Sequence, residues 1–500
     1  MSSQNHSKHV PIEERIDGHP DQAQKGQIGP NIFRYIPLDE KVGDVRLVPS
    51  KDQIKYERRA LFEDLVLDRK RSARFKIEEA FEDEMLYRAV DQPLRPETPA
   101  DPVIPIRYRN PPVGGPTYDV FGDAMHAIFM KLMARSRGVA VEYGHWMAYW
   151  IARDIDTEIS PVKYRECRFT RDQYETENTA EAKKVFSDNM WKVAEAVLWK
   201  YTHNCVLLRT KWSGIHVCGD QMKGQRHKQE DKYVAYPNAM YMDTVSQDPI
   251  ALLGVFDGHG GHECSQYAAS HLWETWMQTR REHSEDMDLQ MQLKTSLDLL
   301  DERMTIRSVK EAWKGGTTAV CCAIDAEKKT LAFAWLGDSP GFIMNNLEFR
   351  KMTREHSPSD PEEGRRVEEA GGQLFLIGGE LRVNGVLNLT RALGDVPGRP
   401  MISNQADTCQ TEYTNSDLLV LLACDGITDV FNMGDLYNLV QAYTNENPVE
   451  DYHEMAHYIC HEAIAHGSAD NCTVVIGFLR PPTEVWNVMR VVFSSDEDDE

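Results

Sequence analysis

The stretch ALLGVFDGHGG, residues 251–261, joins a short apolar run to a carboxylate and a glycine-rich turn. Six consecutive apolar residues that include Val and Phe, followed by a turn signal, are typical of a buried β-strand. The run ends at Asp257, and the glycine directly after it allows the backbone to turn sharply. We therefore expect Asp257 to be a carboxylate held at the end of a rigid strand.

Three further carboxylate sites stand at the ends of apolar runs later in the chain. Asp338 follows LAFAWLG, Asp425 follows LLVLLAC and precedes a glycine, and Asp470 with Asn471 stands just before CTVVIGFL. A turn of this kind is common by itself, but four of them in one region favour convergence of the carboxylates. Unpaired anions that lie close together need a counter-charge. Oxygen ligands without cysteine favour Mg²⁺ or Mn²⁺ over zinc.

A further acidic pair, Glu230 and Asp231, lies in GQRHKQEDKYVAY. If this segment is a strand, its even spacing places Arg226 and Glu230 on one face. His262 and Glu263 stand in the order HxxHE, which matches neither of the zinc motifs HExxH and HxxEH. We therefore interpret these two residues as the start of a helix.

Length and composition exclude several classes of protein. Five hundred residues exceed one ordinary core and indicate two or three domains. A net charge of -23, without a block of Lys and Arg, argues against nucleic-acid binding. No apolar run reaches the roughly 18 to 20 residues of a membrane helix, and residues 1–10 lack a signal-peptide core. Ten cysteines without a CxxC pair suit a reducing compartment, so we expect a cytoplasmic protein that is not secreted, with the nucleus left open.

Changes in residue composition and hydrophobic pattern divide the chain into four segments. Residues 1–50 show no periodicity and are predicted to be disordered. Residues 51–205 are predicted to form an all-helical domain, interrupted by a proline-rich stretch at 93–116. This domain has no cluster of catalytic residue types, so we interpret it as a packing or partner-binding module. Residues 206–481 alternate short apolar runs with amphipathic stretches and predict a mixed α and β domain, and residues 482–500 are interpreted as an acidic tail.

Seven phrases in this order, spread over about residues 210–480, carry a family resemblance: KGQRHKQED, VFDGHGGHE, GGTTAV, LGDS, LTRALGD, LACDGITDV and SADNCTVVIGF. Together they resemble the PPM family, the metal-dependent, type 2C protein serine/threonine phosphatases. The resemblance implies an α+β fold, in which a β-sandwich of two antiparallel sheets is flanked by helices. Here the all-helical domain would precede it. The implied reaction is hydrolysis of phosphoserine and phosphothreonine by a metal-activated water.

The resemblance also implies roles for individual residues. Asp257 would be shared by two Mg²⁺ or Mn²⁺ ions. The other implied metal-site residues are Glu230, Asp231, Gly258 through its carbonyl, Asp338, Asp425 and Asp470. Of these, Asp338 together with Asp425 would suit a third, weaker site.

Four further residues complete the implied site. Arg226 would bind the substrate phosphate, since its planar guanidinium matches phosphate oxygens. His259 would protonate the leaving oxygen as a general acid. Asn471 and Arg391 would support the site. One departure from the family pattern is Pro340, which stands where arginine usually follows LGDS.

The helical half and the phrases KWSGIHV and GHECSQYAA are similar to the nematode feminization (sex-determination) phosphatases of this family. That similarity implies a role in promoting male development, within a complex containing an ankyrin-repeat protein and a ubiquitin-ligase assembly. The helical domain would dock these proteins, and no nucleic-acid or membrane partner is expected. A pseudophosphatase scaffold is the alternative, although it predicts loss of a metal ligand and none of the implied ligands is missing. A two-metal nuclease would need a basic channel, which the charge pattern opposes.

Overall fold

The computed structural model describes residues 215–239, 250–283 and 287–490, together with eight single residues between 122 and 148. The segment predicted to be disordered, residues 1–50, and most of the predicted helical domain lie outside the described residues. The helical domain therefore stays a prediction. Among the helices that the structure describes, none combines the length and the apolar character needed to cross a bilayer.

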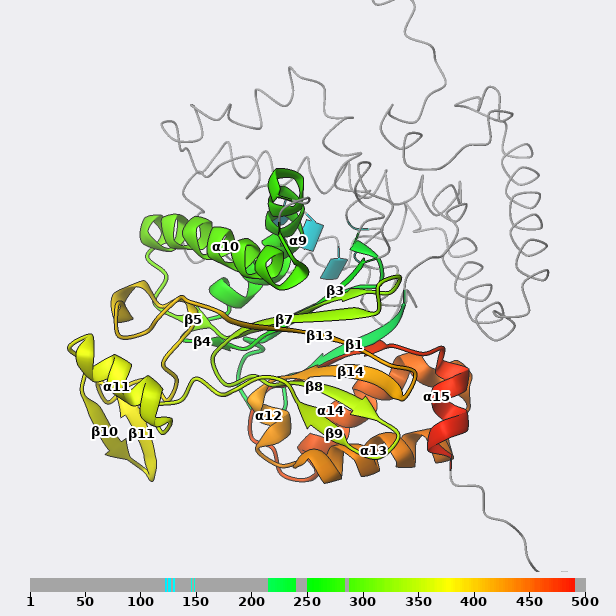
Figure 1. The fold of residues 1–500 in the computed structure, drawn as a ribbon. Helices are drawn as coiled ribbons and strands as arrows, with labels where there is room; N and C mark the ends of the chain where they lie inside the picture. Colours follow the sequence, from blue (N-terminus) through cyan, green and yellow to red (C-terminus); the bar gives the residue numbers. More distant parts are fainter. Residues whose placement is uncertain are drawn as a thin grey trace, which may run out of the picture.

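The core consists of two five-stranded antiparallel sheets that face each other (Figure 1). The first sheet has the strand order β1 (His216–Met222), β15 (Cys472–Phe478), β14 (Asp417–Ala423), β8 (Gly341–Asn345) and β9 (Phe349–Lys351). The second has the order β13 (Asp407–Glu412), β7 (Thr330–Leu336), β6 (Ala319–Asp325), β3 (Ile250–Phe256) and β2 (Lys232–Tyr236).

Helices cover the outer face of each sheet (Figure 1). On the second sheet, α9 (Glu263–His283) and α10 (Leu289–Glu311) pack against β2, β3, β7 and β13. The first sheet is covered by α13 (Met433–Glu446), the 3₁₀ helix η7 (Val449–Glu454) and α14 (Met455–Ala465). Central strands are thus covered on both faces, which explains why β3, β14 and β15 are continuous apolar runs that are buried throughout.

A third, short sheet lies at one edge of the sandwich and has the order β12 (Leu393–Gly394), β5 (Gly316–Thr317) and β4 (Gly258–His259). Beside it protrudes a small unit, residues 353–405, which we call the side subdomain (Figure 1). It contains α11 (Pro361–Glu369), the hairpin β10 (Leu374–Ile377) and β11 (Glu380–Val383), and η6 (Val396–Gly398). The side subdomain has a hydrophobic core of its own, made by Val367, Val383, Leu389, Ala392 and Ile402.

The described residues between 122 and 148 pack against the β-sandwich and the helices that cover it. The Phe129 ring stacks on His145 with 3.7 Å between ring centroids, and His145 lies 4.5 Å from the ring of Tyr236 on β2. The Arg307 guanidinium on α10 donates to both carboxylate oxygens of Asp123, at 3.1 and 2.8 Å. Residues that the sequence assigned to the separate helical domain therefore share a core with the β-sandwich.

The predicted β-sandwich flanked by helices is confirmed, and one predicted boundary is wrong. Residues 482–489 do not belong to an acidic tail but form α15 (Pro482–Met489). Val485, Trp486 and Met489 make a short apolar face that the fold buries, and the Trp486 indole donates to the carbonyl of Asn447 at 2.9 Å. Only residues beyond Arg490 remain for the tail, and these lie outside the described part of the chain.

Candidate active site

The backbone around Asp257 is fixed by the segment that leads into β6. The Asp257 carbonyl accepts hydrogen bonds from the Thr318 amide and the Thr317 hydroxyl, each at 2.9 Å. The Asp257 amide in turn donates to the Thr318 hydroxyl at 3.2 Å. Because the protein satisfies these backbone groups, the Asp257 carboxylate is the group that remains for chemistry at the end of β3.

Two glycines allow distant segments to meet at this edge. A Cβ at Gly258 would lie 2.5 Å from the Glu230 carbonyl oxygen and 2.7 Å from the Ser265 hydroxyl, so a side chain there would displace the Glu230 backbone. Gly426 is packed in the same way against the carbonyl of Asn471, directly beside Asp470. The glycine requirement explains why Asp257 and Asp425 are each followed by glycine.

Asp338 joins the same edge through the loop after β7. The Ser339 hydroxyl next to it makes a 2.7 Å hydrogen bond with the Thr318 hydroxyl. The Pro340 carbonyl accepts from the Ala423 amide at 3.1 Å, which ties this loop to the end of β14. The structure thereby brings the strand-end carboxylates together, and we call Asp257, Asp338, Asp425 and Asp470 the acidic edge.

Electrostatics at the acidic edge disfavour the charged state of its carboxylates. Burial and the charges of Asp231, Asp425 and Asp338 raise the pKa of Asp257 well above its usual range. Burial and the charge of Asp338 raise the pKa of Asp425 to about 7. Two buried carboxyl groups this close to each other disfavour full ionisation of the pair. Burial also raises the pKa of Asp338.

Asp231 lies deeper than the acidic edge. Its carboxylate accepts from the Thr473 hydroxyl on β15 at 2.7 Å, and the residue is 1% exposed. Burial raises the pKa of Asp231 to about 6, and its charge is among the causes that raise the pKa of Asp257. Asp231 thus contacts the acidic edge from the interior of the sandwich.

The prediction that Arg226 and Glu230 share one face of a strand is wrong, because residues 223–231 form a loop between β1 and β2. Asn471 shapes this loop: its amide nitrogen donates to the carbonyls of Lys223 at 2.9 Å and Lys228 at 3.0 Å, and its oxygen accepts from the Glu230 amide at 2.8 Å. A single residue beside Asp470 therefore holds the loop against the acidic edge.

Both side chains of that loop still reach the site. The Arg226 guanidinium pairs with the Asp470 carboxylate, while 59% of the Arg226 side chain is exposed. The Glu230 carboxylate accepts from the Gly261 amide at 3.3 Å, directly after the DGHG turn. The loop thus presents one exposed cation and one carboxylate to the acidic edge.

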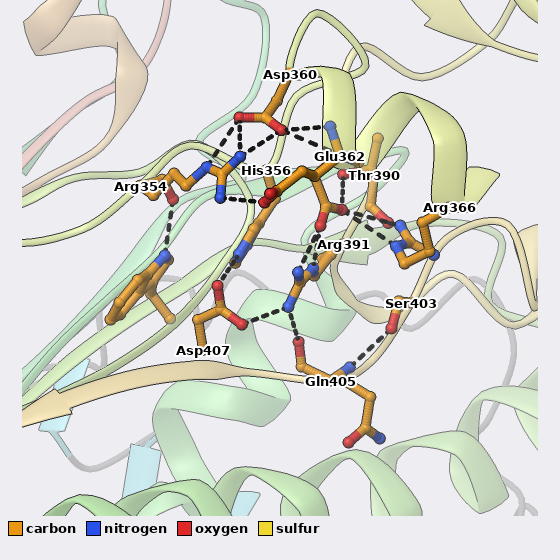
Figure 2. A network of polar contacts seen from close by, with 12 residues as sticks. Arg354, His356, Asp360, Glu362, Arg366, Thr390, Arg391, Ser403, Gln405 and Asp407 are labelled. Atoms are coloured by element: carbon orange, nitrogen blue, oxygen red, sulfur yellow. Dashed lines mark hydrogen bonds and ion pairs between the residues drawn. The ribbon is translucent and has the colours of Figure 1, made fainter.

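His259 and Arg391 have different neighbours. His259 Nε2 lies 2.6 Å from the Asp395 carboxylate, a pairing that sequence alone did not reveal. Arg391 is not bonded to the acidic edge. Figure 2 shows it within a polar network of the side subdomain, where it pairs with Asp407 at 2.7 Å and also with the Glu363 carboxylate. Arg391 therefore joins α11 to β13, and its support of the site is indirect.

The donor set fits a hard divalent cation. Among the described residues, no three Asp, Glu, His or Cys side chains are already grouped so as to hold a metal ion. However, Asp425 Oδ1 is buried without a hydrogen-bond partner, and its neighbours at the acidic edge are also carboxylates. A buried carboxylate oxygen without a partner is costly unless a cation neutralises it, and oxygen ligands suit Mg²⁺ or Mn²⁺. A cation would satisfy this oxygen and neutralise the carboxylates beside it.

Comparisons with known proteins identify the family of the chain. The family model for protein phosphatase 2C matches residues 215–472. The chain is 60% identical over 448 residues to protein phosphatase fem-2 of Caenorhabditis elegans, covering 90% of this chain and 98% of that protein. It is 31% identical over 305 residues to protein phosphatase 1F of Mus musculus, covering 60% of this chain and 65% of that protein.

Among solved structures, that of a C. elegans sex determining protein aligns with a TM-score of 0.70 at 59% identity. This alignment covers 85% of the present chain and 99% of the other. The strand-end carboxylates, the fold and these matches lead to one assignment. The chain belongs to the protein phosphatase 2C family, whose members are protein serine/threonine phosphatases.

Proposed function

We propose that the chain hydrolyses phosphoserine and phosphothreonine in proteins at a centre of two Mg²⁺ or Mn²⁺ ions, with a third, weaker cation site. The observation that carries the proposal is the acidic edge itself. Burial and neighbouring carboxylates raise the pKa of Asp257 and Asp425, and Asp425 Oδ1 has no hydrogen-bond partner among the described residues, so the protein supplies too little positive charge there. Bound cations would lower the pKa of a shared water and hold the charge of the phosphoryl group.

The proposed ligand roles combine the family resemblance with the positions of the side chains. Asp257 stands between the Glu230 loop and Asp425, so it would be the ligand shared by both cations. Glu230 and the Gly258 carbonyl would complete one site, and Asp425 and Asp470 the other. Asp338 lies close enough to Asp425 to raise its pKa and would take part with it in the third site. Asp231 would support Asp257 from the interior.

Two side chains would act on the substrate. Arg226 is more than half exposed on its loop, so its guanidinium can turn from Asp470 to grip a substrate phosphate with two parallel hydrogen bonds. His259 is partly exposed beside Gly258 and would protonate the serine or threonine oxygen as it leaves. Asn471 and Arg391 would hold the loop and the side subdomain in place.

The test is hydrolysis of a phosphoserine peptide by the full chain with Mn²⁺, with excess chelator, and with Mn²⁺ restored. We expect turnover only when Mn²⁺ is present, and none from an Asp257→Asn variant that remains folded. Turnover that is unaffected by chelator would contradict the metal-dependent mechanism. Stable peptide binding without turnover in the presence of Mn²⁺ would favour the pseudophosphatase scaffold.

We also propose a role in sex determination, in which the protein promotes male development within a multiprotein complex. The support is 60% identity across 98% of protein phosphatase fem-2 and the likeness to a solved sex determining protein. Residues 51–205 would dock the partners, which would include an ankyrin-repeat protein and a ubiquitin-ligase assembly, in the cytoplasm. Tethering would supply specificity by raising the local substrate concentration.

A pull-down from nematode extract tests the docking role. We expect the full chain and its Asp257→Asn variant to capture the same ankyrin-repeat protein, because docking is separate from catalysis. A variant with charge reversals on residues 51–120 should lose this capture and keep its activity on the peptide. Equal capture by all three proteins would place the dock elsewhere.

A further inference from the structure

The short sheet at the edge of the sandwich places His259 beside Asp395. In β4, His259 pairs with Gly316 of β5, and on the other side of β5 the same Gly316 pairs with Gly394 of β12. Asp395 follows Gly394 directly. Its side chain extends past Gly316, so that its carboxylate lies 2.6 Å from His259 Nε2. A Cβ at Gly316 would clash with the Asp395 carboxylate, so glycine at this position keeps the path between the two side chains open.

An ion pair between Asp301 and Arg399 holds the backbone that carries Asp395. Asp301 on α10 is 1% exposed and accepts from the Gly394 amide at 2.9 Å. The Arg399 guanidinium donates to both oxygens of Asp301 at 2.7 Å and to the Gly394 carbonyl at 2.9 Å. Asp395 itself is 5% exposed and adopts a left-handed φ of 44°. A strained, buried aspartate with this much support is fixed in one position.

The pairing decides which nitrogen of His259 faces the substrate. A carboxylate only accepts hydrogen bonds, so Nε2 must carry the hydrogen that Asp395 receives. Within the described residues, Nδ1 of His259 makes no hydrogen bond, and 23% of the side chain is exposed. Nδ1 is therefore the nitrogen that is available at the surface of the site.

A second histidine–aspartate pair in the same region shows the contrast. His356 Nε2 lies 3.1 Å from the Asp407 carboxylate, and His356 Nδ1 accepts from the Gly337 amide at 3.1 Å. Both nitrogens of His356 are thus used by the protein, and the residue is 1% exposed. The His356 pair is built to hold structure, whereas the His259 pair leaves one nitrogen for a ligand.

We propose that Asp395 is a positioning residue, which holds His259 through Nε2 so that Nδ1 points at the leaving oxygen of the substrate. This inference rests on the proposed role of His259 as general acid. As the P–O bond breaks, the proton on Nδ1 passes to the serine or threonine oxygen and yields a neutral alcohol. The imidazole is left neutral with its hydrogen on Nε2, still bound to Asp395, and a proton from water restores Nδ1. Asp395 keeps its charge throughout.

The test uses two variants of Asp395 in the full chain with Mn²⁺. Asp395→Gly removes the carboxylate and suits the left-handed backbone, and Asp395→Asn keeps the shape. We expect Asp395→Gly to lower kcat on a phosphoserine peptide by about 10 to 100-fold, the usual effect of losing a residue that orients a functional histidine. Turnover of p-nitrophenyl phosphate should fall by less than about threefold, because its leaving group scarcely needs a proton. Asp395→Asn should lie between wild type and Asp395→Gly.

The double variant Asp395→Gly/His259→Ala separates positioning from a general structural effect. If Asp395 acts through His259, the double variant should be no slower on the peptide than His259→Ala alone. Asp407→Asn is the matched control from the other pair, and it should affect the two substrates equally. Thermal melts of all variants establish that each protein is folded.

Any of the following outcomes would overturn the inference. Equal losses on both substrates in Asp395→Gly, or a multiplied loss in the double variant, would show that Asp395 does not act through His259. If His259→Ala itself loses both activities equally while Mn²⁺-dependent turnover persists, His259 is not the acid, and the inference falls with that role. If His259→Ala loses activity mainly on the peptide but Asp395→Gly loses activity equally on both substrates, only the positioning role of Asp395 is rejected.

Discussion

The acidic edge and the side subdomain both bury carboxylates, but Glu363 of the side subdomain is paired with arginine, whereas Asp257 and Asp425 of the acidic edge have carboxylate neighbours. Although burial opposes it, the hydrogen bonds from Arg391 and Thr390 hold the pKa of Glu363 at about 2. Figure 2 shows the Arg391 guanidinium between that network and Asp407. At the acidic edge, by contrast, burial and a neighbouring carboxylate raise the pKa of Asp425 to about 7.

The difference separates structure from function. A carboxylate that is paired with arginine and hydroxyl donors is complete, and it stabilises the fold by joining two elements. Buried carboxylates whose nearest charged neighbours are other carboxylates destabilise the fold until something from solution neutralises them. We infer the cation site from this missing counter-charge. Substitutions at the acidic edge and in the side subdomain should therefore have different effects.

The largest effect is expected at the acidic edge. Asp257→Asn removes the charge that both cations would share and keeps the shape of the side chain. Hydrolysis of a phosphoserine peptide with Mn²⁺ should fall by more than about 10³-fold, the scale set by loss of a key electrostatic group. Circular dichroism should remain that of the wild type. Wild-type-like turnover in this variant would contradict the assignment of Asp257 as the shared ligand.

In the side subdomain, Glu363→Gln should destabilise the protein. The change leaves the Arg391 guanidinium with a neutral partner in a site where Glu363 is 4% exposed. Breaking one side of a buried ion pair lowers the free energy of unfolding by about 3 kcal/mol. Urea denaturation measures this loss, with Glu380→Gln on the exposed hairpin as the control that should change little. An unchanged midpoint would mean that the Arg391 network is not needed for stability.

At the acidic edge, replacing a carboxylate by an amide should have the opposite effect on the free energy of unfolding. In excess chelator, Asp425→Asn replaces a buried carboxyl that lacks a partner at Oδ1 by a neutral amide. The free energy of unfolding should rise by about 1 to 2 kcal/mol, because repulsion and the cost of burying charge are relieved. Urea denaturation at pH 7.5 measures this gain. A clear loss of stability would show that the carboxylates are compensated in a way the comparison does not include.

A smaller effect is expected from pH. The folded pKa of Glu363, about 2, is below its ordinary value of 4.5, so its contribution to stability is complete above about pH 4.5 and is lost as the pH falls toward 2. Between pH 5 and pH 3.5 the wild type should lose about 1 kcal/mol more than Glu363→Gln. Thermal melts across this range compare the two proteins. Parallel curves would argue against the charged Glu363–Arg391 pair.

The sequence predicted the parts of the site that depend on local signals. Asp257, Asp338 and Asp425 each follow a buried strand, as the apolar runs indicated, and Asp470 precedes one. The family resemblance rather than any periodicity predicted how the sheets are arranged. Local patterns could not show that the loop carrying Arg226 is shaped by Asn471, more than two hundred residues away.

Other features depend on contacts that no window of sequence contains. The Asp395 pairing with His259 exists because β5 lies between β4 and β12, which are far apart in the chain. Likewise, the family resemblance implied that Arg391 supports the site, yet its partners are on α11 and β13. The helix α15 was missed because its apolar face is only three residues wide.

The most direct test of the central claim is a Mn²⁺ titration of thermal stability in the wild type, Asp257→Asn and Glu363→Gln. A cation bound to the folded state at 100 times its Kd adds about 2.7 kcal/mol to the free energy of unfolding. We predict that Tm rises and saturates with Mn²⁺ in the wild type and in Glu363→Gln, and that it stays flat in Asp257→Asn. A flat wild-type curve, or an equal rise in Asp257→Asn, would contradict the conclusion that the acidic edge is a cation site.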